Sequence, residues 1–236
     1  MRYMGSKARI AKDILPIILK GRGEFQWYVE PFVGGFNIMD KVKGKRIASD
    51  NHRYLIALFI AIQKGWVPPD TMAELEYQHI RQNKNKYPDY LVGFVGFACS
   101  FGGKWFGGHA KGNDNNGNPR NHYDESRRHL LKQTALIKNV VIFNKNYYDL
   151  PIPCNSIIYC DPPYANVTKY KSQIDHDRFW NWVRERSEEG HKVFVSEYSA
   201  PDDFECVWSK DLKVYVTRTR GHYKANVKRL FVYKNA

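Results

Sequence analysis

The most constraining feature of this sequence is a run of apolar residues that stops at an acid and two prolines. The stretch reads SIIYCDPPY and covers residues 156–164. Pro162 and Pro163 supply no backbone N–H and fix φ twice, so a β-strand cannot continue through them. Asp161 and Tyr164 are therefore held on a stiff corner at the carboxyl end of a strand. Ligands bind at this edge of open α/β sheets, so the corner is a candidate binding site.

Strand-like and helix-like segments alternate along most of the chain, which predicts a doubly wound parallel α/β sheet. The expected strands are WYVEPF (27–32), KRIASD (45–50), NVVIF (139–143), SIIYC (156–160) and KVFVSE (192–197). The expected helices are SKARIAKDILPIILK (6–20), NHRYLIALFIAIQKG (51–65) and a segment from about 176 to 189 with Phe179, Trp182 and Val183 as its stripe. Ser6 is a candidate N-cap, and Pro16 predicts a kink or an early end. The tail from about 212 to 233 is typical of a hairpin.

The charge balance points to a polyanionic partner. The 236 residues include 37 Lys and Arg against 24 Asp and Glu, which gives a net charge of +13. Aromatic residues make up 15% of the chain, many of them next to Lys or Arg, and aromatic rings stack on unpaired bases. These properties favour a nucleic-acid-binding protein over an enzyme that is merely basic.

The length of the chain and its cysteine content further limit the class of protein to which it can belong. We expect one catalytic domain, residues 1–65 and 139–236, that carries an inserted region, residues 66–138. No apolar run approaches the ~20 residues that span a membrane, and the first residues have no signal-peptide apolar segment. The four cysteines form no CxxC pair and do not cluster with histidines, which argues against disulfides and a metal site. A cytoplasmic protein, monomeric or weakly dimeric, is therefore expected.

The inserted region is the candidate surface for the partner. It contains FACSFGGKWFGGHAKGNDNNGNPRNHY, a long stretch without a regular period. The candidate DNA-binding residues are Lys104, Trp105, Phe106, Lys111 and Arg120. Long basic side chains reach phosphates and guanine edges, and the two rings are suited to wedge into the gap left by a flipped base. Two alternatives stay open: a solvated surface loop, or rings that pack the insertion's own small core.

Two short motifs suggest an adenosine-bearing cofactor without a diphosphate. The strand at 27–32 leads into Gly34 and Gly35, which let a backbone approach a ligand closely. The GxGxxG pattern of dinucleotide folds is absent. The next strand ends in Asp50, where α/β nucleotide folds place an acid on ribose hydroxyls. Each feature alone is weak, since a Gly-Gly pair is usually a turn and Asp50 is equally suited to cap a helix.

The DPPY motif suits a reaction at an exocyclic amino group. The lone pair of a nucleobase amine is delocalised into the ring, so the amine is a poor nucleophile. Hydrogen bonds accepted by a carboxylate and a backbone carbonyl bias that nitrogen toward a pyramidal, reactive shape. The ring of Tyr164 can stack on a base that has been flipped out of the duplex.

Taken together, these motifs resemble the Dam-like DNA adenine N6-methyltransferases of bacteria and their phages. The motifs are YMGSK at 3–7, EPFVGGFN at 30–37, SDN at 49–51 and DPPY at 161–164. They follow the order of the alpha class of that family, and the resemblance covers essentially the whole chain. It implies a Rossmann-like sheet, S-adenosylmethionine (SAM) as the cofactor, and double-stranded DNA as the partner. The compact chain hints at a phage or mobile-element enzyme.

The resemblance also implies roles for the cofactor-binding residues. Tyr3 and Lys7 match the motif that holds the methionine end of SAM. Phe32 and Gly34 match the loop beneath it, and Asp50 matches the ribose ligand. An aromatic residue that packs on the cofactor adenine corresponds to Tyr147 or Tyr148.

For the target base, the resemblance implies that Asp161 and the carbonyl of Pro162 hold its N6 amino group. Tyr164 would stack on the base, and the segment 165–170, ANVTKY, would close over it. The stretch SFGGKWFGG does not resemble the recognition hairpin of GATC-specific members, so the target sequence stays open. The remaining alternatives are cytosine N4 methylation, methylation of adenine in RNA, and a DNA-binding module that has lost turnover.

Some basic and polar residues have two interpretations. Ser196, Glu197 and Tyr198 end the strand after DPPY, where packing or capping explains them as well as contact with a base. The basic segment 217–229 is either a solvated hairpin or a phosphate-binding one. For His109, His122 and His129, which lack metal-ligand spacing, we expect a solvated surface position.

Overall fold

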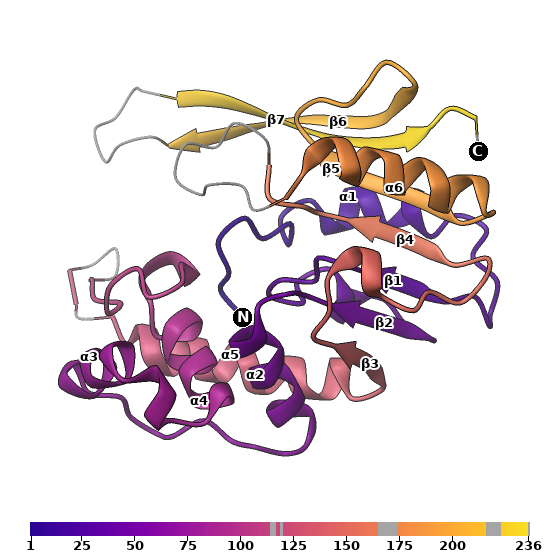
Figure 1. The fold of residues 1–236 in the computed structure, drawn as a ribbon. Helices are drawn as coiled ribbons and strands as arrows, with labels where there is room; N and C mark the ends of the chain where they lie inside the picture. Colours follow the sequence, from indigo (N-terminus) through magenta and orange to yellow (C-terminus); the bar gives the residue numbers. More distant parts are fainter. Residues whose placement is uncertain (114–116, 119, 165–173, 216–222, 236) are drawn as a thin grey trace. The chain divides into compact units, whose positions relative to one another are not determined.

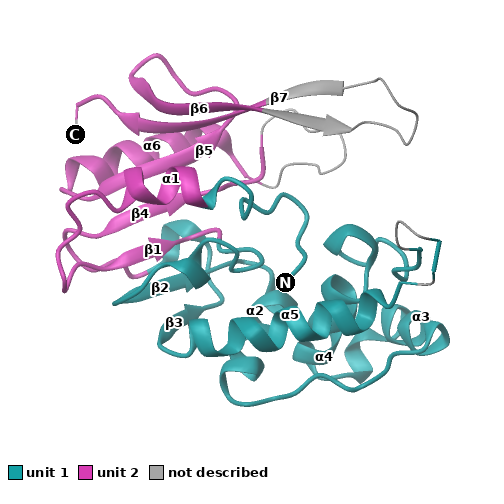
Figure 2. Ribbon diagram, turned by 180° about the vertical axis from the view of Figure 1, so that it is seen from behind, with its two compact units in different colours: residues 1–11, 33–150 teal, residues 12–32, 151–236 magenta. Residues whose placement is uncertain are grey.

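The computed structural model describes residues 1–113, 117–118, 120–164, 174–215 and 223–235 (Figure 1). Two compact units are distinguished in Figure 2. Unit 1 consists of Met1–Ala11 and Val33–Leu150, and unit 2 consists of Lys12–Phe32 and Pro151–Ala236. The segment expected to close over a base, 165–170, and the turn of the basic hairpin lie outside the described residues. The inserted region 66–138 falls within unit 1, and its independence as a domain stays a prediction.

Seven strands form a mixed sheet in the order β3-β2-β1-β4-β5-β7-β6. The strands are β1 Tyr28–Glu30, β2 Arg46–Ser49, β3 Val140–Phe143, β4 Ile157–Cys160, β5 Lys192–Glu197, β6 Phe204–Tyr215 and β7 Tyr223–Tyr233. The pairs β2–β3, β1–β4 and β4–β5 are parallel, whereas β7 is antiparallel to β5 and β6. The order of the first five strands is that of the doubly wound Rossmann fold. The predicted Rossmann-like α/β class is confirmed.

In unit 2, helices lie on both faces of the strands. Helix α6 (His176–Glu188) covers one face and α1 (Ala11–Ile18) lies on the other, as opposite views show (Figures 1 and 2). The predicted stripe of α6 is buried, and Asp175 caps the helix by accepting a hydrogen bond from Arg178 N at 3.0 Å. Lys210 on β6 forms an ion pair with Asp13 on α1 at 2.8 Å.

Two details of this unit differ from the sequence prediction. Helix α1 begins at Ala11 and not at Ser6, whose hydroxyl accepts a hydrogen bond from Ala8 N (3.2 Å) in a turn that precedes the helix. Pro16 lies inside α1, which ends two residues later. The C-terminal hairpin begins at Phe204, eight residues before the predicted start, and a bulge between Cys206 and Trp208 interrupts its alternating pattern.

Unit 1 combines the β2–β3 pair with a helical part, of which α2 (Arg53–Gln63) contacts β3. The other helices are α3 Glu74–Gln82, α4 Asp89–Gly93 and α5 His122–Ile137, with 3₁₀ turns at Met39–Lys41, Lys84–Lys86, Phe101–Gly103 and Tyr147–Asp149 and a π-helical turn at Phe94–Ala98. Gly93 allows α4 to cross α2 closely, since a Cβ there would lie 2.0 Å from the carbonyl oxygen of Tyr54.

The inserted region is more helical than its sequence indicates. Helix α5 buries Tyr123, Ser126, Leu130, Gln133 and Ile137, which follow the i, i+3, i+7 spacing of one helix face. Two of these five residues are polar, so the hydrophobic period of the helix is weak in the sequence. Gln133 is satisfied in the core because its amide donates to the carbonyl of Gly35 at 3.2 Å and to Asp40 at 2.8 Å.

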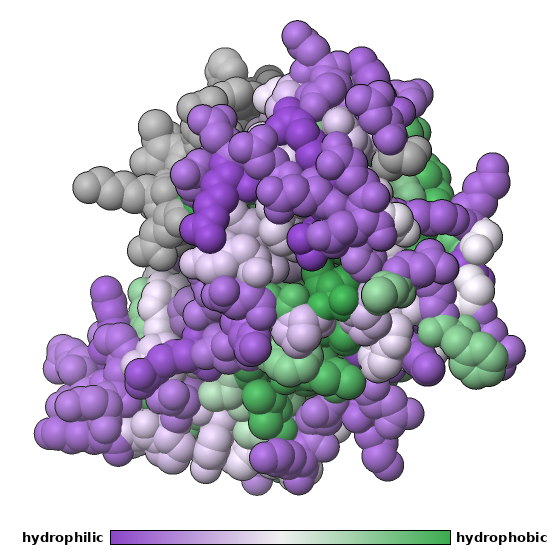
Figure 3. Space-filling view, turned by 45° about the vertical axis from the view of Figure 1, so that its right-hand side comes forward, coloured by the Kyte–Doolittle hydropathy of each residue, from purple (hydrophilic) through white to green (hydrophobic). Residues whose placement is uncertain are grey.

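Hydrophilic residues cover most of the face drawn in Figure 3, where an apolar area interrupts them. This agrees with a chain of which 26% is charged. No helix among the described residues combines the length and the apolar character that crossing a bilayer requires.

Candidate functional site

The strand order reverses between β1 and β4, and both strands belong to unit 2. They are adjacent and parallel, with Tyr28 opposite Ile157 and Val29 opposite Ile158. The chain leaves β1 toward β2 and β3 on one side, and β4 is followed by β5 on the other. Such a switch point opens a crevice at the carboxyl ends of the strands in α/β sheets. The DPPY corner directly follows β4 at this point, as its sequence predicts.

The corner itself is partly buried. Pro162 is buried, whereas Asp161 and Tyr164 are half-buried. The ring of Tyr164 meets the ring of Tyr198 edge to face, with 4.5 Å between the ring centres. Burial, and then the charge of Asp161, raise the pKa of the Tyr164 hydroxyl far above its usual value. Tyr164 is therefore a neutral phenol at physiological pH, available for stacking and not as a base.

Carboxylates stand at the ends of three adjacent parallel strands. Glu30 is the last residue of β1, Asp161 directly follows β4, and Glu197 is the last residue of β5. Glu30 and Glu197 are 2% and 3% exposed. Among the described residues, no such group has the arrangement to hold a metal ion. An acidic edge of this kind suits a cationic ligand or one that donates hydrogen bonds.

Hydrogen bonds fix the two buried acids. Glu30 Oε1 accepts from the hydroxyl of Tyr28 at 2.9 Å, and Glu197 Oε1 accepts from the backbone N–H of Tyr198 at 2.8 Å. Sequence reasoning did not select Glu30 as a site residue, and it left Glu197 between packing or capping and contact with a base. The signal was present, because each is an acid at the last position of an otherwise apolar strand.

In unit 1, Asp50 is tied to the glycine loop. Its Oδ2 accepts from Gly34 N at 3.1 Å, and its Oδ1 accepts from His52 N at 2.9 Å. Burial raises the pKa of Asp50, while these backbone N–H groups act in the opposite direction. Asp50 does not cap α2, since the N-cap is His52, whose Nδ1 accepts from Leu55 N at 3.3 Å.

The glycines of this loop make room for Tyr3. A Cβ on Gly34 would lie 2.7 Å from the Tyr3 ring, and one on Gly35 would lie 2.6 Å from Tyr3 Cβ. Gly34 also has a positive φ of 49°, which an L side chain rarely adopts. The structure thus brings together Tyr3, Gly34 and Asp50, three of the residues assigned to the cofactor.

The other cofactor candidates have different surroundings. Lys7 is 6% exposed, and its ammonium donates to the carbonyl of Gly5 at 3.3 Å. Tyr147 and Tyr148 lie in one 3₁₀ turn with their rings 5.1 Å apart; Tyr147 is 4% exposed and Tyr148 is 41% exposed. Phe32 belongs to unit 2, where it packs edge to face against Phe179 at 5.7 Å.

Trp105 and Phe106, the two aromatic residues among the DNA-binding candidates, pack inside unit 1. Trp105 stacks on Tyr54 at 5.3 Å and contacts Phe106 at 4.7 Å. Phe106 is 8% exposed, and a Cβ on Gly96 would lie 2.2 Å from the Trp105 ring. This arrangement corresponds to the packing alternative that the sequence left open.

His52 links the Asp50 motif to this aromatic cluster, a role that the sequence did not reveal. Its ring lies 4.5 Å from Trp105 and 4.9 Å from Phe97. Burial lowers the pKa of His52 to about 4, so the imidazole is neutral near pH 7 and can accept the capping hydrogen bond. In the sequence, His52 is recognisable only as a polar residue before a helix.

Two of the predicted DNA-binding residues line one cavity of about 380 Å³. Its walls include Lys111, Arg120, His109 and His122, together with Asn113 and Asn121. Lys111 is paired with Glu74, and Arg120 forms two hydrogen bonds to Glu125 at 2.5 and 2.9 Å. Arg2 binds the same Glu125 at 2.6 Å, so two guanidinium groups share one carboxylate.

Two histidines of the insertion are less solvated than the sequence suggests. His109 Nδ1 is buried without a hydrogen-bond partner among the described residues. His122 Nδ1 lies 2.9 Å from Arg2 Nη1. Lys104, in contrast, is exposed and has no carboxylate partner in the described part of the chain.

One family model matches the N-terminal part of the chain. Residues 3–94 match the D12 class of N6 adenine-specific DNA methyltransferases, which confirms the resemblance found in the motifs. Among solved structures, the chain is similar to SMU.472, a protein assigned as a methyltransferase and crystallised with SAH, at 14% identity and a TM-score of 0.39. The match covers 96% of this chain but 52% of the other, so the chain spans about half the length of that protein. No curated protein matches the chain in sequence.

Proposed function

We propose that this chain is a methyltransferase of the D12 class that transfers a methyl group from SAM to the N6 amino group of a flipped-out adenine in duplex DNA. The observation that carries the proposal is the Asp161–Tyr164 corner, which directly follows β4 at the switch point of the sheet. A carboxylate, a proline carbonyl and a neutral phenol ring at one strand end suit an exocyclic amine and the base that bears it.

The chemistry of the residues fits SAM as the methyl donor. Bound SAM supplies an electrophilic methyl group on a positively charged sulfur. The carboxylates of Glu30, Asp161 and Glu197 favour a cation at this edge of the sheet. In unit 1, Asp50 would bind the ribose hydroxyls, and Tyr3 and Lys7 would hold the methionine end. The aromatic partner of the cofactor adenine would be Tyr147 or Tyr148.

Asp161 and the carbonyl of Pro162 would accept hydrogen bonds from the two N–H bonds of the target amine. With its N–H bonds held in this way, the N6 lone pair would be available as the nucleophile for the methyl group that bound SAM would supply. The nitrogen subsequently loses one proton, to Asp161 and from there to water. Tyr164 keeps its proton and stacks on the base. Most of the rate enhancement would come from holding the two reactants in this geometry.

The inserted region, residues 66–138, would provide the DNA contact. Lys104 is exposed, Arg120 lies in a cavity wall, and Glu125 is bound by both Arg120 and Arg2. Lys111 lines the same cavity. Long basic side chains in this setting suit phosphates and guanine edges. We assign Trp105 and Phe106 to the packing of the insertion, because their rings lie in its aromatic cluster.

Incubation with SAM labelled in its methyl group tests the activity. The protein is supplied with duplex DNA or RNA, the nucleic acid is digested to nucleosides, and the labelled product is identified. N6-methyldeoxyadenosine is the expected product. Labelled N4-methylcytosine would support the cytosine alternative, a product from RNA only would reassign the substrate, and no product at all would favour a binding module.

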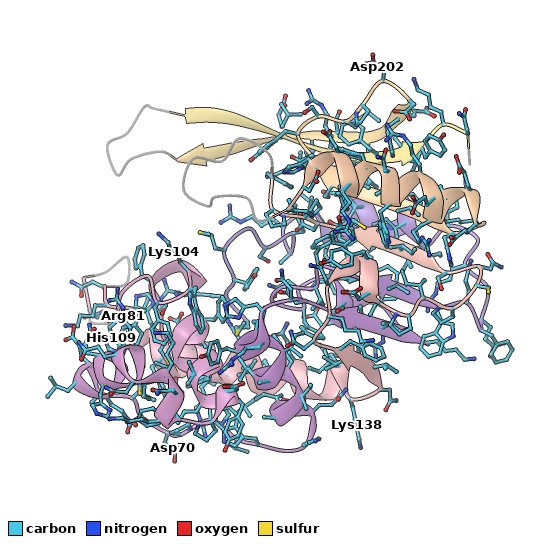
Figure 4. All side chains as sticks on the ribbon, in the orientation of Figure 1. Asp70, Arg81, Lys104, His109, Lys138 and Asp202 are labelled. Atoms are coloured by element: carbon cyan, nitrogen blue, oxygen red, sulfur yellow. The ribbon has the colours of Figure 1, made fainter. Side chains whose placement is uncertain are left out.

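Lys104→Ala should weaken the binding of all duplex DNA alike. Because a phosphate contact releases a counterion, the slope of log affinity against log salt should fall by about one. Lys138 is a matched control: it is an exposed lysine of unit 1 that Figure 4 places far from Lys104, Arg81 and His109. Lys138→Ala should leave both the affinity and the slope unchanged.

Arg120→Ala distinguishes a base contact from a phosphate contact. Loss of a base contact should cost about 1–3 kcal/mol and relax one position of the recognised site. SAM affinity, measured by calorimetry, should be that of the unchanged protein in both variants. If neither Lys104→Ala nor Arg120→Ala changes DNA affinity, salt slope or site preference, recognition lies outside this region.

A further inference from the structure

The ammonium group of Lys228 lies against the tyrosine of the proposed catalytic corner. Its Nζ is 4.5 Å from the ring centre of Tyr164 and 4.6 Å from the ring centre of Tyr198. The same Nζ is 3.3 Å from the hydroxyl oxygen of Tyr198. The cation is therefore held between two aromatic rings that touch each other and one hydroxyl that accepts its hydrogen bond.

The pairing of β5 with β7 places these groups. The two strands are antiparallel, with Glu197 opposite Arg229. Tyr198 follows Glu197 and Lys228 precedes Arg229, so both stand one step beyond this pair at the carboxyl end of β5. The guanidinium of Arg229 donates to the carbonyl of Tyr198. Since Glu197 also binds the N–H of Tyr198, the backbone of Tyr198 is fixed on both sides.

We propose that Lys228 is a positioning residue of the base pocket, holding the ring of Tyr164 through Tyr198 at the angle needed to stack on the target base. The inference rests on the proposed function, because it needs Tyr164 to be the stacking ring. A cation over an aromatic face restrains that ring more than an apolar side chain does. Two rings bound to one cation also restrain each other, so neither can rotate without losing a contact.

The basic hairpin offered a different role for this lysine, namely contact with DNA phosphates. The head group of a phosphate-binding lysine extends into solvent, whereas the head group of Lys228 is over two ring faces and beside a hydroxyl. A positioning role predicts a loss in turnover, and a phosphate contact predicts a loss in DNA affinity. The two roles are therefore separable by experiment.

Lys228→Met keeps the length of the side chain and removes its charge. We expect kcat for DNA methylation to fall by roughly fivefold to thirtyfold, as expected for the loss of a desolvated cation–π contact. DNA affinity, its salt slope and SAM affinity should all stay level. Lys228→Arg should recover part of kcat, because a guanidinium also lies over aromatic faces. Tyr198→Phe, which removes only the accepting hydroxyl, should lower kcat by a smaller factor.

Lys192→Met is the matched control, since Lys192 is an exposed lysine at the opposite end of β5. It should leave kcat unchanged, and thermal melting of each variant checks that it is folded. The inference is overturned if Lys228→Met methylates DNA as fast as the unchanged protein, or if it loses DNA affinity with a salt slope reduced by about one. If the unchanged protein methylates no nucleic acid, the proposed function itself fails, and the inference falls with it.

Discussion

Asp161→Ala should reduce methyl transfer to DNA by about a hundredfold to ten-thousandfold while SAM affinity changes by less than about tenfold. Asp161 is the only carboxylate of the DPPY corner, and its proposed partner is the target amine rather than the cofactor. Removing it takes away both the hydrogen bond that orients N6 and the first acceptor of its proton. Losses of about 10²–10⁴ are typical for a group with such a role. Single-turnover methylation measures the rate, and calorimetry measures SAM binding.

Two further variants sharpen this experiment. Asp161→Asn keeps the size of the side chain but not its charge, so it should retain a hydrogen bond and recover only a small part of the rate. Asp202→Ala removes an exposed carboxylate of unit 2, shown in Figure 4, and should behave as the unchanged protein. Near-normal turnover of Asp161→Ala would mean that the DPPY corner is not where the amine is methylated.

The sheet could be predicted because its strands carry strong local signals. The three parallel strands β1, β4 and β5 are short apolar runs bounded by Pro, Gly or acids, and the two prolines after Asp161 end β4 without help from tertiary contacts. The start of β6 was missed because Glu205 and the bulge at Cys206 break the alternation that marks a strand.

The insertion was harder to predict, since long-range contacts determine its structure. Helix α5 buries Ser126 and Gln133, and only partners far along the chain, such as Gly35 and Asp40, make that burial favourable. Likewise, the absence of a side chain at Gly96 is explained only by the structure, in which the Trp105 ring occupies the space beside it.

The residues of the candidate site also fall into two groups: those that a local motif predicts and those that only the long-range fold brings into place. Asp50, Gly34 and Asp161 stand next to strand ends or glycine turns, so short motifs were sufficient to select them. Lys228 is one lysine among many in a basic segment, and nothing local distinguishes it. Its relation to Tyr164 depends on the register of β5 and β7, which is set by the whole sheet.

Asp50→Ala should weaken SAM binding by about 1.5–3 kcal/mol, which corresponds to roughly tenfold to 150-fold in Kd. The loss is that of a charge-assisted hydrogen bond to the ribose, because Asp50 stands at the end of β2 beside the glycine loop. Part of the effect would come from Gly34, whose N–H loses its acceptor. Asp50→Asn separates the two causes, since an amide oxygen can still accept from Gly34 while the charge is gone.

The pH dependence of SAM affinity gives an independent check on Asp50. Burial raises the pKa of this carboxyl above the ordinary value of 3.8, so as the pH falls Asp50 becomes protonated earlier than an exposed acid. The charged form binds the ribose, and the advantage of the unchanged protein over Asp50→Asn should therefore shrink as the pH is lowered through this raised pKa. Asp70→Ala is the control, because the Asp70 side chain is 88% exposed in the same unit. Equal dissociation constants for the unchanged protein and Asp50→Ala would leave Asp50 with a purely structural role, as the residue that holds Gly34 and the start of α2.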